Sequence, residues 1–319
     1  MNNIEYFLTN KTSLDKFITG KNIMKTYDVM HSCPVSESLI IYRTGDIIVP
    51  EYLTIDFKDS IYSINEIKTR LKNKILYLSI GNMVSSFPLN LLMILNEPII
   101  CDNIVYINLS FNMFLNSIEL TRLHQSEVKF SFDKETISSN DIFDYSITFT
   151  TTYYESFFHD EIKEYIMQQI SSINVHITPE KEYINNVYKC SLPLSHVIKG
   201  LFIECNNINQ LNVLRLTINN ITRFSLDKFA ILTKCIKIND NTIYFPFNNE
   251  QSYLDRSKES FEGSINFSIC CPKQLELLFD NPIDSINIYS VGGNIYRQYE
   301  GLCINAFMSD DPNNTSISI

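Results

Sequence analysis

The sequence predicts an all-β protein made of two consecutive β-sandwiches, and three observations lead to this fold class. Apolar and polar residues alternate with a period of two in many short segments, turn-forming residues separate these segments, and one strong helical pattern lies near the middle of the chain. Short alternating strands divided by turns are typical of sandwiches and barrels. Strand-rich sequence on both sides of a central helix indicates two such units.

The alternating segments occur in both halves of the chain. Leu53, Ile55 and Phe57 alternate with more polar neighbours, which is the pattern of a strand with one buried face. The other apolar faces with this spacing are Val128, Phe130 and Phe132; Ile147 and Phe149; Leu214, Leu216 and Ile218; Ile265, Phe267 and Ile269; Leu275, Leu277 and Phe279; and Ile286 and Ile288. Turns between strands are expected at Asn239-Asp240-Asn241 and at Gly292-Gly293-Asn294.

Helical patterns are few. The clearest runs from Phe158 to Ser171, where apolar residues fall at helical spacing and Asp160 and Glu161 suit the N-terminal end of a helix. A weaker pattern lies near Ser13 to Tyr27. The segment from Pro88 to Leu95 is apolar on all sides and fits either a short buried helix or a strand.

A helical linker at residues 158–172 leaves about 130 residues on each side. Each block has room for about eight strands of five to six residues, which fits a jelly roll. We therefore expect an N-terminal arm (1–30), a first jelly roll (31–157), the helical linker (158–172), a second jelly roll (173–310) and a C-terminal tail (311–319). The two halves have no obvious sequence repeat, so the predicted duplication is structural.

Charge and hydropathy exclude several classes of partner. The net charge of −10 and the pI near 5.0 argue against a surface that neutralises phosphates, so we expect no direct nucleic acid binding. The chain has no run of eighteen apolar residues and no basic segment followed by an apolar one at its N-terminus. We expect a soluble protein that is not secreted.

The sequence indicates no metal, no cofactor and no catalytic residue. Its eight cysteines include no C-x-x-C pair, its five histidines form no ligand motif, and no phosphate-binding loop or nucleophile elbow occurs. Asp46 and Glu127 lie beside strand-like segments and are the one carboxylate pair considered for glycoside hydrolysis, but no spacing singles them out among 36 acidic residues. We therefore predict a protein that is not an enzyme.

Tyrosines offer the other candidate binding groups. Tyr153, Tyr154, Tyr289, Tyr296 and Tyr299 could stack on sugars or bases if they were exposed. In an acidic sandwich, packing against neighbouring subunits is the better interpretation of such residues. A carbohydrate-binding β-sandwich remains the rival prediction from another class.

Short motifs in a fixed order carry a family resemblance over residues 38 to 307. They are Tyr42 to Ile48 followed by Tyr52 to Ile55; Ile80-Gly81-Asn82; Ile104 to Phe114; Ile118 to Phe132; Tyr153 to Ile170; His196 to Leu201; Phe261 to Ser268; and Asn294 to Phe307. In this order they resemble the R-x-G-D-L strand, the I-G-G turn, the end of the first jelly roll, the linker and the closing strands of the major capsid proteins of nucleocytoplasmic large DNA viruses. Met113-Phe114 replaces that family's P-F-W, tryptophan is absent, and the chain is shorter than usual for the family.

The resemblance implies a structural protein whose homotrimers form pseudo-hexagonal capsomers of an icosahedral shell. Its implied partners are further copies of itself, neighbouring capsomers, minor capsid proteins and the inner viral membrane. The N-terminal arm, Met1 to Met30, would contact a neighbouring subunit or this membrane. Its implied location is the virion, with assembly in the host cytoplasm. A transient assembly scaffold or a minor capsid paralogue of the same fold is the alternative that the shorter chain leaves open.

Overall fold

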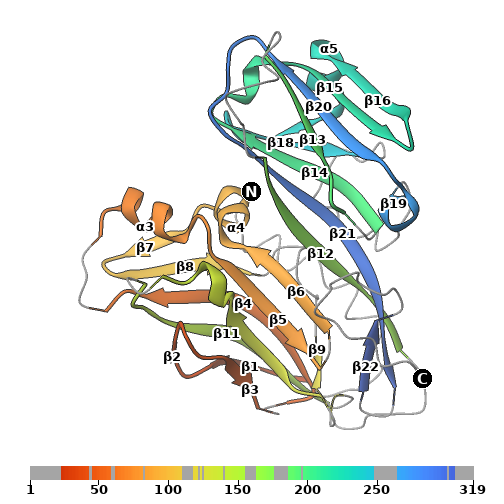
Figure 1. The fold of residues 1–319 in the computed structure, drawn as a ribbon. Coiled ribbons are helices and arrows are strands. Elements are labelled where there is room, and N and C mark those ends of the chain that lie inside the picture. Colours follow the sequence, from red (N-terminus) through yellow and green to blue (C-terminus); the bar gives the residue numbers. More distant parts are fainter. Residues whose placement is uncertain are drawn as a thin grey trace.

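The computed structural model shows two β-sandwiches, one built by the first half of the chain and one by the second (Figure 1). It describes residues 23–42, 45–58, 62–81, 83–109, 118–120, 123, 126–138, 141–154, 163–175, 186–194, 197–247, 264–299 and 302–305. The strands of both sandwiches pair antiparallel throughout the described residues. The fold is therefore all-β with few short helices, as the sequence predicts.

The first sandwich consists of a larger and a smaller sheet. The larger sheet has the strand order β1-β11-β4-β8-β7, with β2 and β9 paired to β11 and β4, and we call it sheet A; the smaller has the order β3-β10-β5-β6. The bounds are β1 Ile23–Val29, β2 Cys33–Pro34, β3 Leu39–Ile41, β4 Ile47–Asp56, α3 Ile64–Leu71, β5 Ile75–Ile80, β6 Met83–Pro88, α4 Leu89–Leu95, β7 Ile99–Cys101, β8 Ile104–Asn108, β9 Ile118–Glu119, β10 Val128–Phe132, the 3₁₀ helix Lys134–Thr136 and β11 Asp144–Tyr154.

The second sandwich repeats this plan. Its larger sheet has the order β12-β21-β14-β18-β17, with β19 and β22 paired to β14 and β21, and we call it sheet C; its smaller sheet has the order β13-β20-β15-β16. The bounds are β12 Lys163–Val175, β13 Val187–Ser191, β14 Val197–Cys205, the 3₁₀ helix Ile208–Gln210, β15 Leu211–Ile218, β16 Ile221–Asp227, α5 Lys228–Lys234, β17 Ile236–Lys237, β18 Thr242–Pro246, β19 Ile265–Asn266, the 3₁₀ helix Phe267–Ile269, β20 Lys273–Phe279, β21 Ile286–Tyr299 and β22 Leu302–Asn305.

The two sandwiches match in the main strands of both sheets, whereas β2, which follows β1, and β22, which follows β21, have no counterparts among the described residues. In the larger sheets, the order β1-β11-β4-β8-β7 corresponds to β12-β21-β14-β18-β17. In the smaller sheets, the order β3-β10-β5-β6 corresponds to β13-β20-β15-β16. Each also has a seven-residue helix directly after the edge strand of its smaller sheet, α4 after β6 and α5 after β16. The duplication predicted without a sequence repeat is therefore present in the structure.

Alternating apolar residues fill the two cores, as period-two strands require. The predicted faces Leu53 to Phe57, Val128 to Phe132, Ile147 to Phe149, Leu214 to Ile218, Leu275 to Phe279 and Ile286 to Ile288 all have their apolar side chains buried. The structure also decides the ambiguous segment after residue 87, because β6 ends at Pro88 and residues 89–95 form the largely buried helix α4.

The predicted helical linker is wrong where the structure describes it. Residues 163–175 form strand β12, which pairs with β21 in an unbroken register from Lys163 opposite Gln298 to Val175 opposite Ile286. The segment contains Ile166, Ile170, Ile173 and Val175, whose branched β-carbons favour strands, and the pairing with a distant strand overrides the local helical spacing. The part of the prediction from 158 to 162 lies outside the described residues.

Three further expectations need correction. Residues 23–29 form β1 at the edge of sheet A, so this part of the predicted arm and of the weak helix near Ser13 to Tyr27 is a strand of the first sandwich. Gly292 and Gly293 lie inside β21 and not in a turn, opposite the bulge that skips Lys199 in β14. The predicted strand from Ile265 ends at Asn266, and a 3₁₀ turn leaves Ile269 exposed.

Candidate assembly interface

The first sandwich packs against the second through β6 and α4. In Figure 1, α4 lies between the two sandwiches, and β6 lies beside β12 of the second. The helix is apolar apart from Asn90, and its residues Leu89 to Met93 are all buried. A short helix that is buried all round must contact a second apolar surface besides its own sheet, and sheet C supplies that surface.

Sheet C offers aromatic side chains on the face that meets the first sandwich. Phe202, Tyr244, Tyr289 and Val291 belong to the same buried cluster as the core of the first sandwich, whereas Leu201 and Ile203 of β14 belong to the core of the second. The rings of Phe202 and Tyr244 pack at a centroid distance of 4.6 Å. The outer face of sheet C is therefore a buried interface, and its inner face is a core.

A polar cluster crosses this interface at its centre. The amide Nδ2 of Asn90, on α4, donates to Glu204 Oε2 at 2.8 Å and to Tyr289 Oη at 2.7 Å. The Tyr289 hydroxyl donates to the same Glu204 oxygen at 3.1 Å, and Asn287 Nδ2 donates to it at 2.9 Å. Three donors from both sandwiches thus converge on one carboxylate oxygen, which stabilises its charge in a partly buried place.

Burial raises the pKa of Tyr289 above its ordinary value, and the negative charge of Glu204 raises it further. The hydroxyl therefore stays protonated and remains a donor at physiological pH. Because hydrogen bonds are directional, the cluster fixes the lateral and rotational position of the two sandwiches relative to each other. Hydrophobic burial alone, which is non-directional, would not do so.

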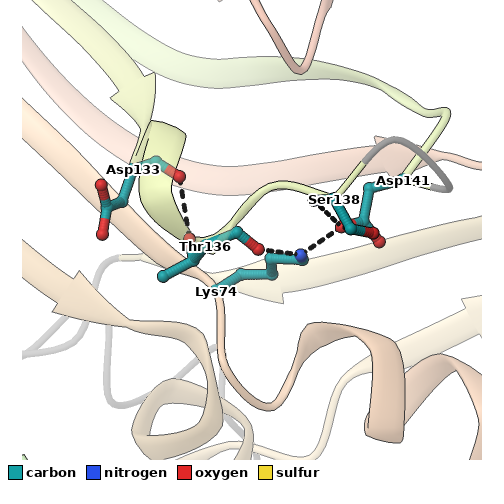
Figure 2. Close-up of polar contacts among 5 residues, drawn as sticks. All are labelled: Lys74, Asp133, Thr136, Ser138 and Asp141. Atoms are coloured by element: carbon teal, nitrogen blue, oxygen red, sulfur yellow. Dashed lines mark hydrogen bonds and ion pairs between the residues drawn. The ribbon is translucent and has the colours of Figure 1, made fainter.

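A second polar cluster fastens a loop of the first sandwich (Figure 2). Lys74 Nζ, directly before β5, forms an ion pair with Asp141 and donates to the backbone oxygen of Thr136. The backbone N–H and the hydroxyl of Ser138 donate to Asp141 Oδ2 at 2.7 and 2.8 Å. Burial opposes the ionisation of Asp141, but the hydrogen bonds from Lys74 and Ser138 outweigh it and hold the pKa of this carboxyl below its usual range. The pair binds the connection between β10 and β11 to the start of β5.

The carboxylates that the sequence offered for catalysis lie next to strands of different sheets. Asp46 precedes β4 in sheet A, whereas Glu127 precedes β10 in the opposite sheet and is exposed. Among the candidate aromatic residues, Tyr289 is buried in the interface between the sandwiches and presents no stacking face to a ligand. The side chains of Tyr153, Tyr154, Tyr296 and Tyr299 lie outside the described residues.

The described cysteines are free thiols. Burial raises the pKa of Cys190 and of Cys205 to about 11, and that of Cys235 to about 12. At neutral pH these groups are protonated, and a thiol is neither a good nucleophile nor a metal ligand. Within the part of the chain that the structure describes, no three His, Cys, Asp or Glu residues are grouped so as to hold a metal ion, and no helix is long and apolar enough to cross a membrane.

No protein-family model matches the sequence, and no curated protein matches it. Solved structures do match the fold. The structure of VP54 of PBCV-1, fitted into a reconstruction of the virophage Sputnik, superposes with a TM-score of 0.68 at 12% identity, covering 92% of this chain and 99% of the other. The chain has the double jelly-roll fold of viral capsid proteins. The quasi-atomic model of the PBCV-1 capsid gives a TM-score of 0.67 at 12% identity, with the same coverage of 92% and 99%.

The double jelly roll confirms the fold class that the sequence predicts, including two consecutive sandwiches. The interface between them was not predicted, although one signal pointed to it. Asn90 is the one amide in the otherwise apolar segment from Leu89 to Met93. A polar residue in a buried helix needs a partner, so its position indicated a contact outside the first core. The partner, Glu204, is 114 residues away, and no local pattern connects the two.

Proposed function

We propose that this chain is a structural capsid protein, not an enzyme, whose homotrimers form the pseudo-hexagonal capsomers of an icosahedral DNA virus shell. The observation that carries the proposal is the duplicated sandwich, which spans 92% of this chain and 99% of the VP54 chain. A duplicated domain suits this role because three copies present six similar sandwiches around one axis. A block with nearly sixfold shape packs hexagonally with its neighbours.

Rigidity supports the same role. The interface between the sandwiches buries Phe202 and Tyr289 and joins both halves through Glu204. Two domains with a large apolar interface move as one body, in contrast to domains joined by a polar contact. A shell needs such rigid blocks, because its lateral contacts must each bury more than about 1,000 Å² in fixed positions to be specific.

The proposed partners follow from this role. They are further copies of the chain, neighbouring capsomers and minor capsid proteins, in a virion assembled in the host cytoplasm. The net charge of −10 disfavours direct binding of nucleic acid.

Residues 1–22, which precede β1, are proposed to contact a neighbouring subunit or the inner viral membrane. Deleting residues 1–22 should then leave trimers intact but prevent their assembly into shells, and normal shells from the shortened chain would contradict this contact.

The first test is the mass of the purified protein in solution, measured by light scattering over a wide concentration range. A stable particle of three times 37.1 kDa is expected. Electron microscopy of the same sample should show hexagonal particles with six lobes. A strict monomer at high concentration would contradict the proposed capsomer.

A transient scaffold or a minor paralogue would have the same fold, and the composition of the virion distinguishes them. A major shell protein is abundant in purified mature particles, a minor paralogue is present in few copies, and a scaffold is found only in immature particles. Quantitative mass spectrometry of both particle types measures this directly. The carbohydrate-binding alternative predicts a monomer that binds glycans, and the burial of Tyr289 removes one of the residues on which it depended.

A further inference from the structure

We propose that α5 of one copy docks on the outer face of sheet A of a second copy, with Phe229 and Leu232 as its anchors. The inference rests on the proposed function and goes beyond it, because it assigns the two surfaces that join neighbouring chains. Its basis is the internal contact described above. The first sandwich places α4 on sheet C, and the duplicated plan provides a second helix, α5, and a second sheet, sheet A, which lie far apart in one chain.

The two helices can be aligned residue by residue. Each has seven residues and begins directly after the edge strand of the smaller sheet. The N–H of Asn96 donates to the oxygen of Leu92, and the N–H of Cys235 donates to the oxygen of Ile231, so these end bonds set the same register. Asn90 therefore corresponds to Phe229, and Met93 corresponds to Leu232.

The corresponding positions differ sharply in exposure. Asn90 and Met93 are 8% and 9% exposed, and Asn90 reaches Glu204 and Tyr289 of sheet C. Phe229 and Leu232 are 75% and 73% exposed, one turn apart on the same face of α5. Two large apolar side chains side by side in solvent are unfavourable for a monomer, and such pairs mark interaction sites. The same two helix positions are thus buried in the first sandwich and exposed to solvent in the second.

The receiving sheets can be aligned in the same way. The N–H of Phe57 donates to the oxygen of Asn103, as that of Cys205 does to the oxygen of Asn241. Counting along the strands from these two hydrogen bonds, Thr54 corresponds to Phe202 and Tyr106 corresponds to Tyr244; Thr54 lies opposite Tyr106 just as Phe202 lies opposite Tyr244. The pairing of β4 with β11, and of β14 with β21, then matches Ser146 with Tyr289.

Apolar residues at the edge of sheet A repeat the pattern of exposure. On β17, Ile236 lies opposite Tyr244 and packs against the buried interface cluster. Its counterpart on β7 is Ile99, which lies opposite Tyr106 and is 65% exposed. Cys101, two residues further along β7, is also exposed. Sheet A thus presents apolar groups at the positions that sheet C uses to hold α4.

The sizes of the opposed residues are complementary. Within the chain, the small Asn90 meets the large ring of Tyr289 across the interface, and Phe202 belongs to the same buried cluster as Tyr289. In the proposed contact, the large ring of Phe229 lies over the half-buried Thr54 and the neighbouring Ser146, a small residue that is 9% exposed in the single chain. The exchange of small and large residues keeps the space between helix and sheet filled, which close packing requires.

The carboxylate at the centre of the interface also differs between the two sheets, in a way that fits the change from Asn90 to Phe229 on the helix. Glu204 needs the amide of Asn90 as a donor, and Phe229 cannot provide one. The residue corresponding to Glu204 is Asp56, whose Oδ1 accepts from the backbone N–H of Lys58 at 2.8 Å, and Asp144 beside it pairs with Lys58 at 3.0 Å. These carboxylates have partners within their own chain, so an apolar helix face can cover the neighbouring part of the sheet without leaving them unpaired.

The occupant must be a second copy. Figure 1 shows α5 at the end of the second sandwich that points away from α4, and β7 at the end of the first sandwich that points away from the second. One chain cannot bring these two surfaces together. Different surfaces on the two partners make a head-to-tail contact, which closes into a ring when the rotation between copies allows it.

Two monomeric variants and their mixture test the contact. The helix variant is Phe229→Asp/Leu232→Asp, and the sheet variant is Ile99→Asp/Cys101→Asp. All four residues are exposed in the single chain, so both variants should keep the fold. Circular dichroism checks that they do. Each variant is expected to weaken association by about 100-fold or more, as for anchors at the centre of an interface, and to be monomeric by light scattering. Ile269→Asp, which changes a residue that is 79% exposed elsewhere on the second sandwich, is the matched control and should leave the oligomer intact.

The mixture identifies the head-to-tail geometry. The helix variant keeps a normal sheet A and the sheet variant keeps a normal α5, so together they form one intact contact and should give a dimer of twice 37.1 kDa. If both variants remain trimers, or if Ile269→Asp dissociates the oligomer equally, the assigned surfaces are wrong while the proposed capsomer stands. If the unchanged protein is itself a strict monomer, the capsomer and this contact both fail. Two monomeric variants whose mixture stays monomeric would overturn the head-to-tail pairing of α5 with sheet A.

Discussion

Lys74 and Asp141 form the most deeply buried ion pair among the described residues, with side chains only 6% and 8% exposed. Lys74→Met removes the cation and leaves the Asp141 carboxylate buried beside the Ser138 donors alone. The loss of one partner of a buried pair costs roughly 3–5 kcal/mol. Urea unfolding should show this decrease in the free energy of unfolding. Lys58→Met, which breaks the more exposed pair with Asp144 (side chains 45% and 24% exposed), is the control and should cost less than Lys74→Met.

The same pair predicts a pH dependence. The pKa of Asp141 is lower in the folded protein than its ordinary value, so on acidification the unfolded chain takes up the proton first. The contribution to stability is therefore complete above the ordinary carboxyl pKa of about 3.9 and is lost as the pH falls through the lower folded value. The difference in unfolding free energy between the unchanged protein and Lys74→Met should shrink between about pH 5 and pH 3. A difference that is constant over this range would contradict the assignment.

Asn90 carries the second prediction at this scale. Asn90→Asp has almost the same shape but places a second carboxylate against Glu204 Oε2, where the amide donated. The lost hydrogen bond and the new repulsion should lower the free energy of unfolding by more than Asn90→Ala, which removes the donor alone and costs about 1–3 kcal/mol. Thermal unfolding at neutral pH measures both changes. Asn65→Asp on the exposed side of α3 is the control, and an equal effect there would argue against the buried cluster.

At the level of elements, two helices begin with side-chain caps. The Ser63 hydroxyl oxygen accepts from the backbone N–H of Glu66, and the Glu66 carboxylate accepts from the backbone N–H of Ser63. At the other helix, the Asp227 carboxylate accepts from the backbone N–H of Ala230. Ser63→Ala and Asp227→Ala should each cost about 1 kcal/mol, because each leaves an N–H of the first turn without its partner. Asp227→Asn keeps an acceptor and is the control, since it should cost less than Asp227→Ala. Chemical unfolding measures all three.

Strands were predicted from the sequence where one face is buried, because burial itself produces the alternation. Leu53, Ile55 and Phe57 show this in β4. The prediction failed where long-range pairing decides the structure. Residues 163–171 have helical spacing but form β12, because β21 supplies backbone partners more than a hundred residues later in the chain. The glycines of β21 were read as a turn for the same reason, since the bulge opposite them lies in β14.

The candidate interface was predictable only in part. The sequence marked the apolar segment around Leu89 to Leu95, but whether it formed a helix or a strand depended on contacts that periodicity does not contain. The exposure of Phe229 and Leu232 could not be predicted, because their spacing is that of a core-facing helix stripe. Only the comparison of α5 with α4 in three dimensions shows that this stripe faces away from its own core.

At the scale of the whole molecule, the buried cluster of the first sandwich includes residues of the second. Phe202 and Tyr289 are 1% and 5% exposed, and both lie on the outer face of sheet C, where they join the buried cluster of the first sandwich. The two sandwiches should therefore unfold together, and calorimetry of the unchanged protein should show one transition with equal calorimetric and van't Hoff enthalpies.

Removing the interface should separate the two halves. Phe202→Ala/Tyr289→Ala deletes two buried rings but leaves the inner faces of both sandwiches complete, since Leu201, Ile203 and Ile288 lie in the core of the second. Truncation of a buried aromatic residue costs about 3–5 kcal/mol, and here this loss falls on the contact between the halves. The variant should show two transitions.

Phe279→Ala, in the second core, is the control: it should lower the stability of that sandwich without removing the contact between the halves. A single transition in the double variant would mean that the connection through β12 and β21, and not the aromatic interface, couples the two sandwiches.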